Sequence, residues 1–204
     1  MIKKILTIVI LLLAVFMGYG LYKTIQEPIT FKNEKSKREA AVIQNLKDVR
    51  TAQQAYRGIT GGFAHSFDTL SQVILNDSFQ LIQIFGDPDD PTGASFTSDT
   101  SYIIAADSLA KVFTDGDVAA LESFLSNLRN VPYGENNETF EIAAELIEYE
   151  SIEVWVTEVR VQKKVFMGSE YGKEKYTNYD DRYDPSAYLR FGDMGSPNLS
   201  GNWE

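Results

Sequence analysis

A run of eighteen residues without a charge, from Ile5 to Tyr22, constrains this chain more than any other part of its sequence. At about 1.5 Å per residue, a helix of this length measures roughly 27 Å, which is close to the thickness of the hydrocarbon core of a bilayer. Lys3 and Lys4 precede the run, and Lys23 follows it as a cation that can reach the headgroups. The sequence therefore predicts a membrane anchor over residues 1–27 that meets lipid through residues 5–22.

The processing and the orientation of this anchor each have an alternative. Gly18-Tyr19-Gly20 loosely imitates a signal-peptide cleavage site, but the run is longer than the usual apolar region of a signal peptide, so we favour an uncleaved span. The lysines after the run outnumber those before it, so the charge rule alone leaves the orientation open. A short basic head before an apolar run is typical of a signal anchor. We therefore expect a cytoplasmic N-terminus and a body that is periplasmic or extracellular.

Composition narrows the chemistry of the rest of the chain. The formal net charge is -10, from 19 Lys and Arg against 29 Asp and Glu, so the body has little reason to bind nucleic acid. There is no cysteine, which excludes disulfides, thiolate zinc sites and cysteine nucleophiles. His65 is the single histidine, so a multi-histidine metal site is excluded and a hydrolase triad has little support.

The body, residues 28–168, is predicted to begin with an amphipathic stem helix. Pro28 is expected to interrupt or kink the membrane helix, with a short break at Glu27-Pro28, and a second helix then begins near Asn33 and continues to about Arg57. Apolar residues recur at helical spacing along one face, which predicts one buried stripe: Val42, Leu46, Val49 and Tyr56. Glycines end this helix, because glycine both caps helices and permits the turn that follows.

Short elements are predicted between the stem and the main hairpin. Ser66 can cap a helix that extends to about Leu75, and helical spacing of apolar residues predicts another helix from Val118 to Leu128. Strands are expected over residues 79–85 and around residues 102–106, on either side of an acidic loop that contains proline.

The clearest strand signal is a hairpin formed by residues 140–147 and 152–161, in which apolar and polar residues alternate. Val159 and Val161 resume the alternation one residue out of phase, which predicts a bulge at Thr157-Glu158. The predicted fold class is therefore α+β, with a transmembrane helix followed by a stem helix that packs on an antiparallel sheet.

The last segment, residues 169–204, is rich in Tyr, Asp, Gly and Asn and has little periodicity, so we predict an irregular C-terminal lobe. Its aromatic side chains are predicted to be exposed as a contact surface for partner proteins, because aromatics bury a large area beside one polar group. The alternative is that about half of them cover the sheet. These residues are Tyr171, Tyr176, Tyr179, Tyr183 and Trp203.

Carboxylates cluster at two places where they could hold a hard cation, since calcium takes six to eight oxygen ligands from flexible loops. The first cluster is Asp87, Asp89 and Asp90, and the second is Asp180, Asp181 and Asp184. Neither matches the helix-loop-helix calcium pattern, and ordinary turn chemistry explains the first. The second is the candidate calcium site, and no other cofactor is expected.

The stretch Ala41 to Leu70 resembles the stem helix and first turn of type II secretion pseudopilins and related type IV pilins. The similarity lies in Asp48-Val49-Arg50, in Tyr56, and in Gly61 followed by Phe63. It implies a helix packed on an antiparallel sheet. A pilin carries a glutamate near the start of its apolar run and this run has none, so the resemblance does not extend to filament polymerisation.

The whole chain is also similar to uncharacterised single-span proteins of Bacteroidetes bacteria and their phages. That similarity adds the loop Gly86-Asp87-Pro88-Asp89-Asp90 and the closing Gly201-Asn202-Trp203-Glu204. Together these features predict a non-enzymatic, membrane-anchored envelope protein that assembles with other envelope proteins or with itself. Two alternatives are an anchored hydrolase that uses carboxylates and an adhesive module stabilised by calcium.

Overall fold

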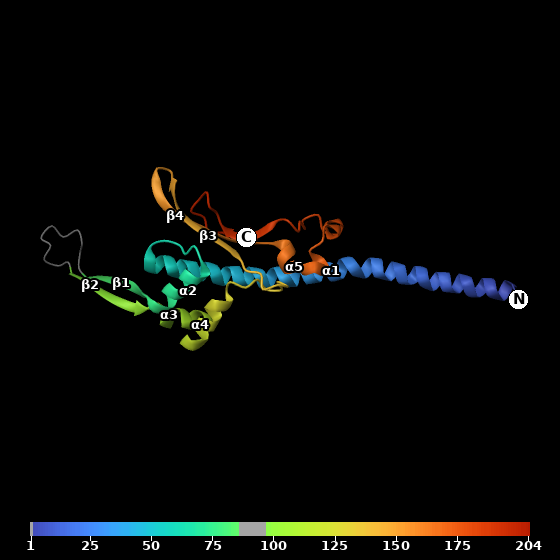
Figure 1. Cartoon of the computed structure of the whole chain (residues 1–204), viewed down its shortest axis with the longest axis horizontal. Coiled ribbons are helices and arrows are strands. Elements are labelled where there is room, and N and C mark those ends of the chain that lie inside the picture. The colour runs from blue at the N-terminus through green and yellow to red at the C-terminus, as the bar shows by residue number, and fades with distance from the viewer. Residues whose placement is uncertain (1, 86–96) are drawn as a thin grey trace.

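The computed structural model describes residues 2–85 and 97–204, so the acidic loop with Asp87, Asp89 and Asp90 lies outside the described residues. The fold is α+β, with a long N-terminal helix and two small antiparallel sheets. Figure 1 shows that the other elements gather along the C-terminal half of this helix. The elements are α1 (Ile2–Thr60), α2 (Phe67–Asn76), β1 (Ser78–Phe85), β2 (Thr97–Ile104), α3 (Ala105–Phe113), α4 (Val118–Asn127), β3 (Glu141–Tyr149), β4 (Ile152–Gln162), α5 (Lys163–Tyr171), the 3-10 helix η1 (Glu174–Tyr179) and β5 (Tyr188–Gly192).

Helix α1 continues through Pro28, so the predicted break at this residue and the separate start near Asn33 are wrong. Proline removes one backbone donor and costs about 3 kcal/mol inside a helix. Packing offsets this cost here, because Phe31 is fully buried against the body less than one turn beyond the proline. The helix therefore also crosses the predicted domain boundary after residue 27.

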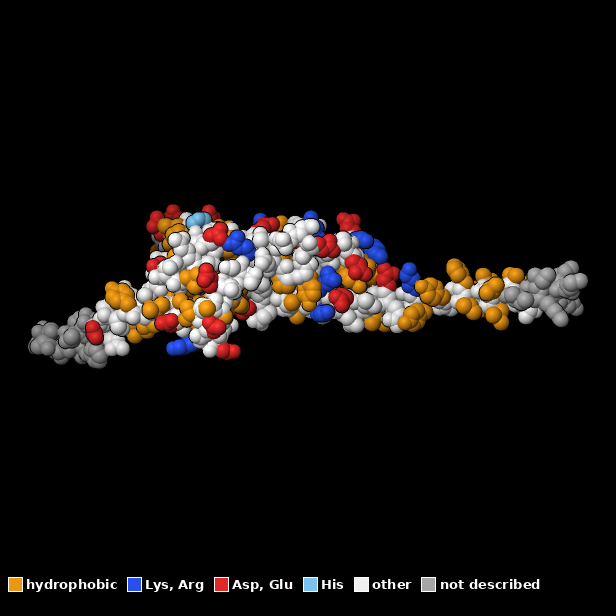
Figure 2. Space-filling model, turned by 60° about the horizontal axis from the view of Figure 1, so that its bottom comes forward, with side chains coloured by type: hydrophobic (Ala, Val, Ile, Leu, Met, Phe, Trp, Pro, Cys, Tyr) orange, Lys and Arg blue, Asp and Glu red, His pale blue; other side chains and the backbone are white. Residues whose placement is uncertain are grey.

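The N-terminal part of α1 projects from the body, and the large apolar side chains that the structure describes between Leu6 and Ile25 are exposed. Figure 2 shows these side chains around the bare helix, with charged side chains concentrated on the body. This part of the helix is long and apolar enough to cross a membrane, by length and composition alone.

The C-terminal part of α1 is the stem that the sequence predicted. Val42, Leu46 and Val49 are fully buried, and Tyr56 is half-buried against the same core. The buried stripe is thus confirmed. The helix ends at Thr60, where Gly61 takes a positive φ of 82° and its N–H still donates to the carbonyl of Arg57.

Gln53 fixes the turn that follows the stem. Its buried side-chain amide donates to the carbonyl oxygen of Ala64 at 2.8 Å and accepts from the N–H of Ala64 at 2.9 Å. A buried amide that is satisfied at both ends holds the turn against the helix. Ser66 then caps α2 by accepting from the N–H of Thr69, as the sequence predicted.

The larger sheet has the order β3-β4-β5, with both pairs antiparallel. The predicted hairpin is confirmed as β3 and β4, but the bulge at Thr157-Glu158 is wrong, because the pairing runs without a gap from Glu141 with Arg160 to Tyr149 with Ile152. The change of phase has another cause. Val156, Thr157, Glu158 and Val159 are all buried, so both faces of β4 are covered at this point.

The smaller sheet is a two-stranded ribbon of β1 and β2 at the end of the body opposite the N-terminus (Figure 1). Strand β2 ends at Ile104, two residues before the predicted end, because Ala105 and Ala106 already belong to α3. Helix α4 lies where the sequence predicted it and is capped by Asp117, whose carboxylate accepts from the N–H groups of Ala119 and Ala120.

The C-terminal segment is more regular than the lobe that the sequence predicted. It contains the end of α5, the 3-10 helix η1 and the strand β5, which pairs with β4 from Glu158 with Gly192 to Gln162 with Tyr188. The segment therefore supplies the third strand of the larger sheet. The residues of β4 that pair with β5 lie about 30 residues earlier in the chain, so no local sequence pattern predicts this pairing.

Candidate functional site

The tail tyrosines gather around one residue of α1. Phe31 stacks on Tyr176 with the ring centroids 4.6 Å apart, and it meets the edge of Tyr183 at 5.0 Å. The rings of Tyr171 and Tyr179 lie within 6.5 Å of it. We call these five rings the aromatic junction. They join the C-terminal segment to the helix at the point where α1 leaves the body.

This arrangement corrects the predicted exposure of the tail aromatics. Tyr176 and Tyr183 are buried, while Tyr171, Tyr179 and Trp203 are half-buried and pack against the core. No sequence pattern points to Phe31, because it lies between Pro28 and the expected start of the stem helix near Asn33. A contact role for the half-buried aromatics stays a prediction.

Charged side chains fasten the same segment to α1. Lys35 Nζ lies 2.6 Å from a carboxylate oxygen of Asp180, and Lys175 Nζ lies 2.7 Å from Glu27. The guanidinium of Arg38 donates to the carbonyl oxygens of Phe166 at 3.2 Å and Met167 at 2.8 Å. Arg38 thereby satisfies carbonyls of α5, which is a stronger fastening than an exposed ion pair.

Two of the three candidate calcium ligands are bound to protein partners. Asp180 pairs with Lys35 and also accepts from the N–H of Arg182, and Asp184 accepts from the N–H of Ser186 at 2.8 Å. Asp181 is exposed. Across residues 2–85 and 97–204, no three carboxylate or histidine side chains stand together as a group that could hold a metal ion.

Burial changes the pKa of a tyrosine in the aromatic junction. It raises the pKa of Tyr183 from 10.0 to about 12, and the hydroxyl of Tyr183 donates to the carbonyl oxygen of Tyr171 at 2.9 Å. The pKa of Asp180 is lowered by its hydrogen bond from Lys35. The folded junction therefore favours a neutral Tyr183 and an ionised Asp180.

We predict that Tyr183→Phe destabilises the chain at neutral pH and that this loss disappears at high pH. The lost hydrogen bond is worth about 1 kcal/mol. A raised folded-state pKa contributes stability that is complete below pH 10 and is lost as the pH rises towards 12, so the advantage of the wild type should vanish across that window. Denaturant unfolding between pH 7 and 12 measures it, with Tyr102→Phe on the exposed ribbon as the control. A difference between wild type and Tyr183→Phe that stays constant with pH contradicts the prediction.

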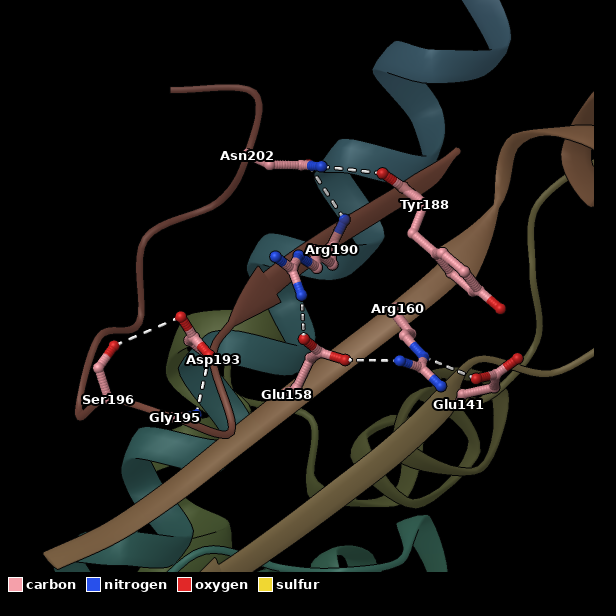
Figure 3. Close-up of polar contacts among 9 residues, drawn as sticks. All are labelled: Glu141, Glu158, Arg160, Tyr188, Arg190, Asp193, Gly195, Ser196 and Asn202. Carbon is pink, nitrogen blue, oxygen red and sulfur yellow. Dashed lines mark hydrogen bonds and ion pairs between the residues drawn. The ribbon is translucent and has the colours of Figure 1, made fainter. Parts of the chain in front are cut away.

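A second polar cluster lies on the larger sheet (Figure 3). Glu158 is buried between two guanidinium groups, with Arg160 at 3.1 Å and Arg190 at 2.5 Å from its two carboxylate oxygens. Arg160 also donates to Glu141 at 2.7 Å, and this hydrogen bond raises its pKa. One network therefore links β3, β4 and β5.

The chemistry of this network suits a structural clamp. Both oxygens of Glu158 accept charge-assisted hydrogen bonds from arginine side chains, and these bonds tie β4 to β5. The sequence did not reveal this cluster, although Glu158 and Arg160 lie two residues apart on one strand face, opposite Glu141. This spacing is the sequence signal from which an ion pair on the sheet could have been predicted.

Two further residues are candidates for catalysis, His65 and Asp48, and within the described part of the chain neither has a second catalytic side chain as its hydrogen-bond partner. His65 is exposed, and it makes no hydrogen bond to any residue that the structure describes. Burial raises the pKa of Asp48, but the hydrogen-bond partner of this carboxylate is the amide of Gln44 at 3.0 Å. A glycosidase-type pair needs two carboxyl groups facing each other across a cleft. Asp48 faces the side-chain amide of Gln44, so it does not form such a pair.

Comparison of the chain with protein-family models, with curated protein sequences and with solved structures gives no match.

Proposed function

We propose that this chain is a single-span, membrane-anchored envelope protein whose body assembles with other proteins and does not catalyse a reaction. The observation that carries this proposal is the projecting half of α1, on which apolar side chains are exposed on every side. The body faces the periplasm or the outside of the cell in this proposal, with the N-terminus in the cytoplasm.

Lipid is the environment that the projecting helix favours. Burying a Leu, Val, Ile or Phe side chain gains about 1.5–3 kcal/mol relative to leaving it in water, and many such side chains are exposed here in one continuous helix. Tyr19 and Tyr22 stand at the body end of the run and Lys23 follows, which is the order expected at the boundary between lipid and water.

A role in assembly is supported by the outline of the body. A long helix whose first half is free and whose second half packs beside an antiparallel sheet agrees with what the pseudopilin resemblance implies. Two carboxylates of the larger sheet, Glu141 and Glu158, are bound to arginines. These pairings favour a role in assembly over a role in hydrolysis.

Flotation with lipid vesicles tests the anchor. We expect the full-length chain to float with vesicles and to resist extraction with alkaline carbonate. Replacing Leu12 and Val15 with Asp should release it, because each acidic residue at the centre of a span costs about 2.5–3.5 kcal/mol. Replacing Val112 and Val118 with Asp is the matched control, because Val112 is as exposed as Leu12, at 63% against 62%, but lies on the body.

Recovery of a soluble mature chain that lacks its first twenty or so residues would reject the anchor and favour a cleaved signal peptide. Protease accessibility of the body in intact spheroplasts tests the orientation. Cross-linking followed by mass spectrometry tests the assembly role, which predicts protein partners or a second copy. A monomer with empty pull-downs from detergent extracts would reject that role.

A further inference from the structure

The β1–β2 ribbon differs in charge from the rest of the body. Its two strands, SFQLIQIF and TSDTSYII, contain one charged residue, Asp99, and no proline. The hairpin of β3 and β4 carries Glu at several positions along both strands. Because the chain has a net charge of -10, two copies repel each other, and the strands of the ribbon contribute one negative charge to that repulsion.

Both faces of the ribbon are apolar and exposed. The pairing of β1 with β2 places Ile82, Tyr102 and Ile104 on one face, and all three side chains are exposed. Leu81 and Ile103 are exposed on the other face. Figure 2 shows apolar side chains on this end of the molecule. A two-stranded ribbon in water is marginally stable on its own, and further strands would stabilise it.

The ribbon also presents two open edges. Within the residues that the structure describes, β1 pairs with β2 and with no other strand, so each strand has a row of backbone groups free on its outer side. Charged residues and prolines usually protect such edges, and these strands have almost none. In the larger sheet, by contrast, β5 is partly covered by the bridge between Phe191 and Gly201.

We propose that the ribbon is a self-association surface, on which β2 of one copy pairs with β1 of a second copy in the same membrane. This inference rests on the proposed membrane anchor, which gives all copies the same orientation. Figure 1 shows the ribbon extending along the long axis of the molecule, away from the N-terminus. In two copies with one orientation the β1 strands therefore run the same way, and β1 meets β2 of its neighbour antiparallel.

Among antiparallel arrangements, this geometry selects one. Pairing of β1 with β1 in antiparallel register requires copies that point in opposite directions, which one membrane does not provide. Pairing of β2 with the neighbour's β1 forms the sheet β1-β2-β1-β2 and leaves an open edge at each end, so further copies can add. The partner that fits the ribbon is thus a second copy of this chain, placed side by side.

Disulfide trapping tests the arrangement, and the natural chain has no cysteine to interfere. One population carries Gln80→Cys or Ile82→Cys on β1, and a second, with a different tag, carries Thr100→Cys or Tyr102→Cys on β2. The pairing of β1 with β2 places all four positions on one face. The two populations are mixed in vesicles of phosphatidylethanolamine and phosphatidylglycerol. We expect the mixed disulfide between β1 and β2 to exceed both same-strand disulfides.

Disulfides between β1 and β1 would overturn the side-by-side arrangement, and trapping no greater than with Val112→Cys on α3 would overturn self-association. Ile82→Glu, added to the pair that traps best among the other positions, should lower the mixed product by about fivefold, because it removes the apolar contact that Ile82 would make across the new strand pair, worth about 1 kcal/mol. Val112→Glu is the matched control. Flotation of the same vesicles separates the two proposals: floating without trapping rejects the ribbon, and trapping without floating rejects the anchor.

Discussion

Replacing Phe31 with Ala should lower the free energy of unfolding of the body by about 3–5 kcal/mol, the range for truncation of a fully buried phenylalanine. The side chain has no exposed surface and contacts four tyrosine rings, two of them in stacked or edge-on geometry. Such ring pairs add about 0.5–1.5 kcal/mol beyond the area that they bury. The measurement is denaturant unfolding of the full chain in a mild detergent.

Ile29→Ala is the matched control for this variant. Ile29 lies on the same helix two residues earlier and is 49% exposed, so its truncation removes little packing. The Phe31 variant should also make the C-terminal segment sensitive to limited proteolysis between η1 and β5, because the aromatic junction joins that segment to α1. Equal losses of stability in the two variants would mean that the junction does not hold the segment.

Features set by short-range patterns could be predicted from the sequence. Val42, Leu46 and Val49 recur at helical spacing and are all buried. The alternation in residues 140–161 specified the hairpin of β3 and β4, and Ser66 was found as the cap of α2. In each case the residues that determine the structure lie within a few positions of one another, so local propensity and the final packing agree.

Pro28 and the tail could not be predicted in this way. A local rule ends a helix at proline, and here a tertiary contact at Phe31 overrides it. The tail tyrosines have no periodicity of their own because their partner lies about 140 residues earlier in the chain. The phase change in β4 predicts a bulge from local rules, whereas its cause is a sheet covered on both faces, with Arg190 of a distant strand pairing with Glu158.

The candidate sites show the same difference between features set by neighbouring residues and features set by distant ones. The residue types in the tail were a sound guide to where contacts form, but they could not distinguish contacts within the chain from contacts with a partner. Asp180 illustrates the difficulty, because three nearby carboxylates look like cation ligands until Lys35, which lies on α1, is placed beside one of them. The ribbon has the opposite property: its low charge, with Asp99 as the one charged residue of its strands, is visible in the sequence, but its open edges are visible only in the fold.

Gly192→Ala should be the most damaging change among the glycines at positive φ, with an expected loss of about 3–5 kcal/mol in the free energy of unfolding when backbone strain and overpacking are combined. Gly192 ends β5 at a φ of 79°. An added Cβ would overlap the carbonyl oxygen of Thr157 and come within 3.3 Å of the Cα of Glu158. Both are backbone atoms of β4, so no side-chain rotation can relieve the contact.

Gly116→Ala separates the two causes of that loss. Gly116 has a φ of 93°, but a Cβ there meets nothing within 4 Å, so this variant should lose only the backbone strain of about 1–2 kcal/mol. Amide hydrogen exchange should show loss of protection in β5 for Gly192→Ala and none there for Gly116→Ala. If the two variants lose the same stability, β5 does not approach β4 this closely, and the C-terminal segment is not the third strand of the sheet. If they differ as expected, the segment that begins at the aromatic junction is held at both of its ends, by Phe31 at one and by strand pairing at the other.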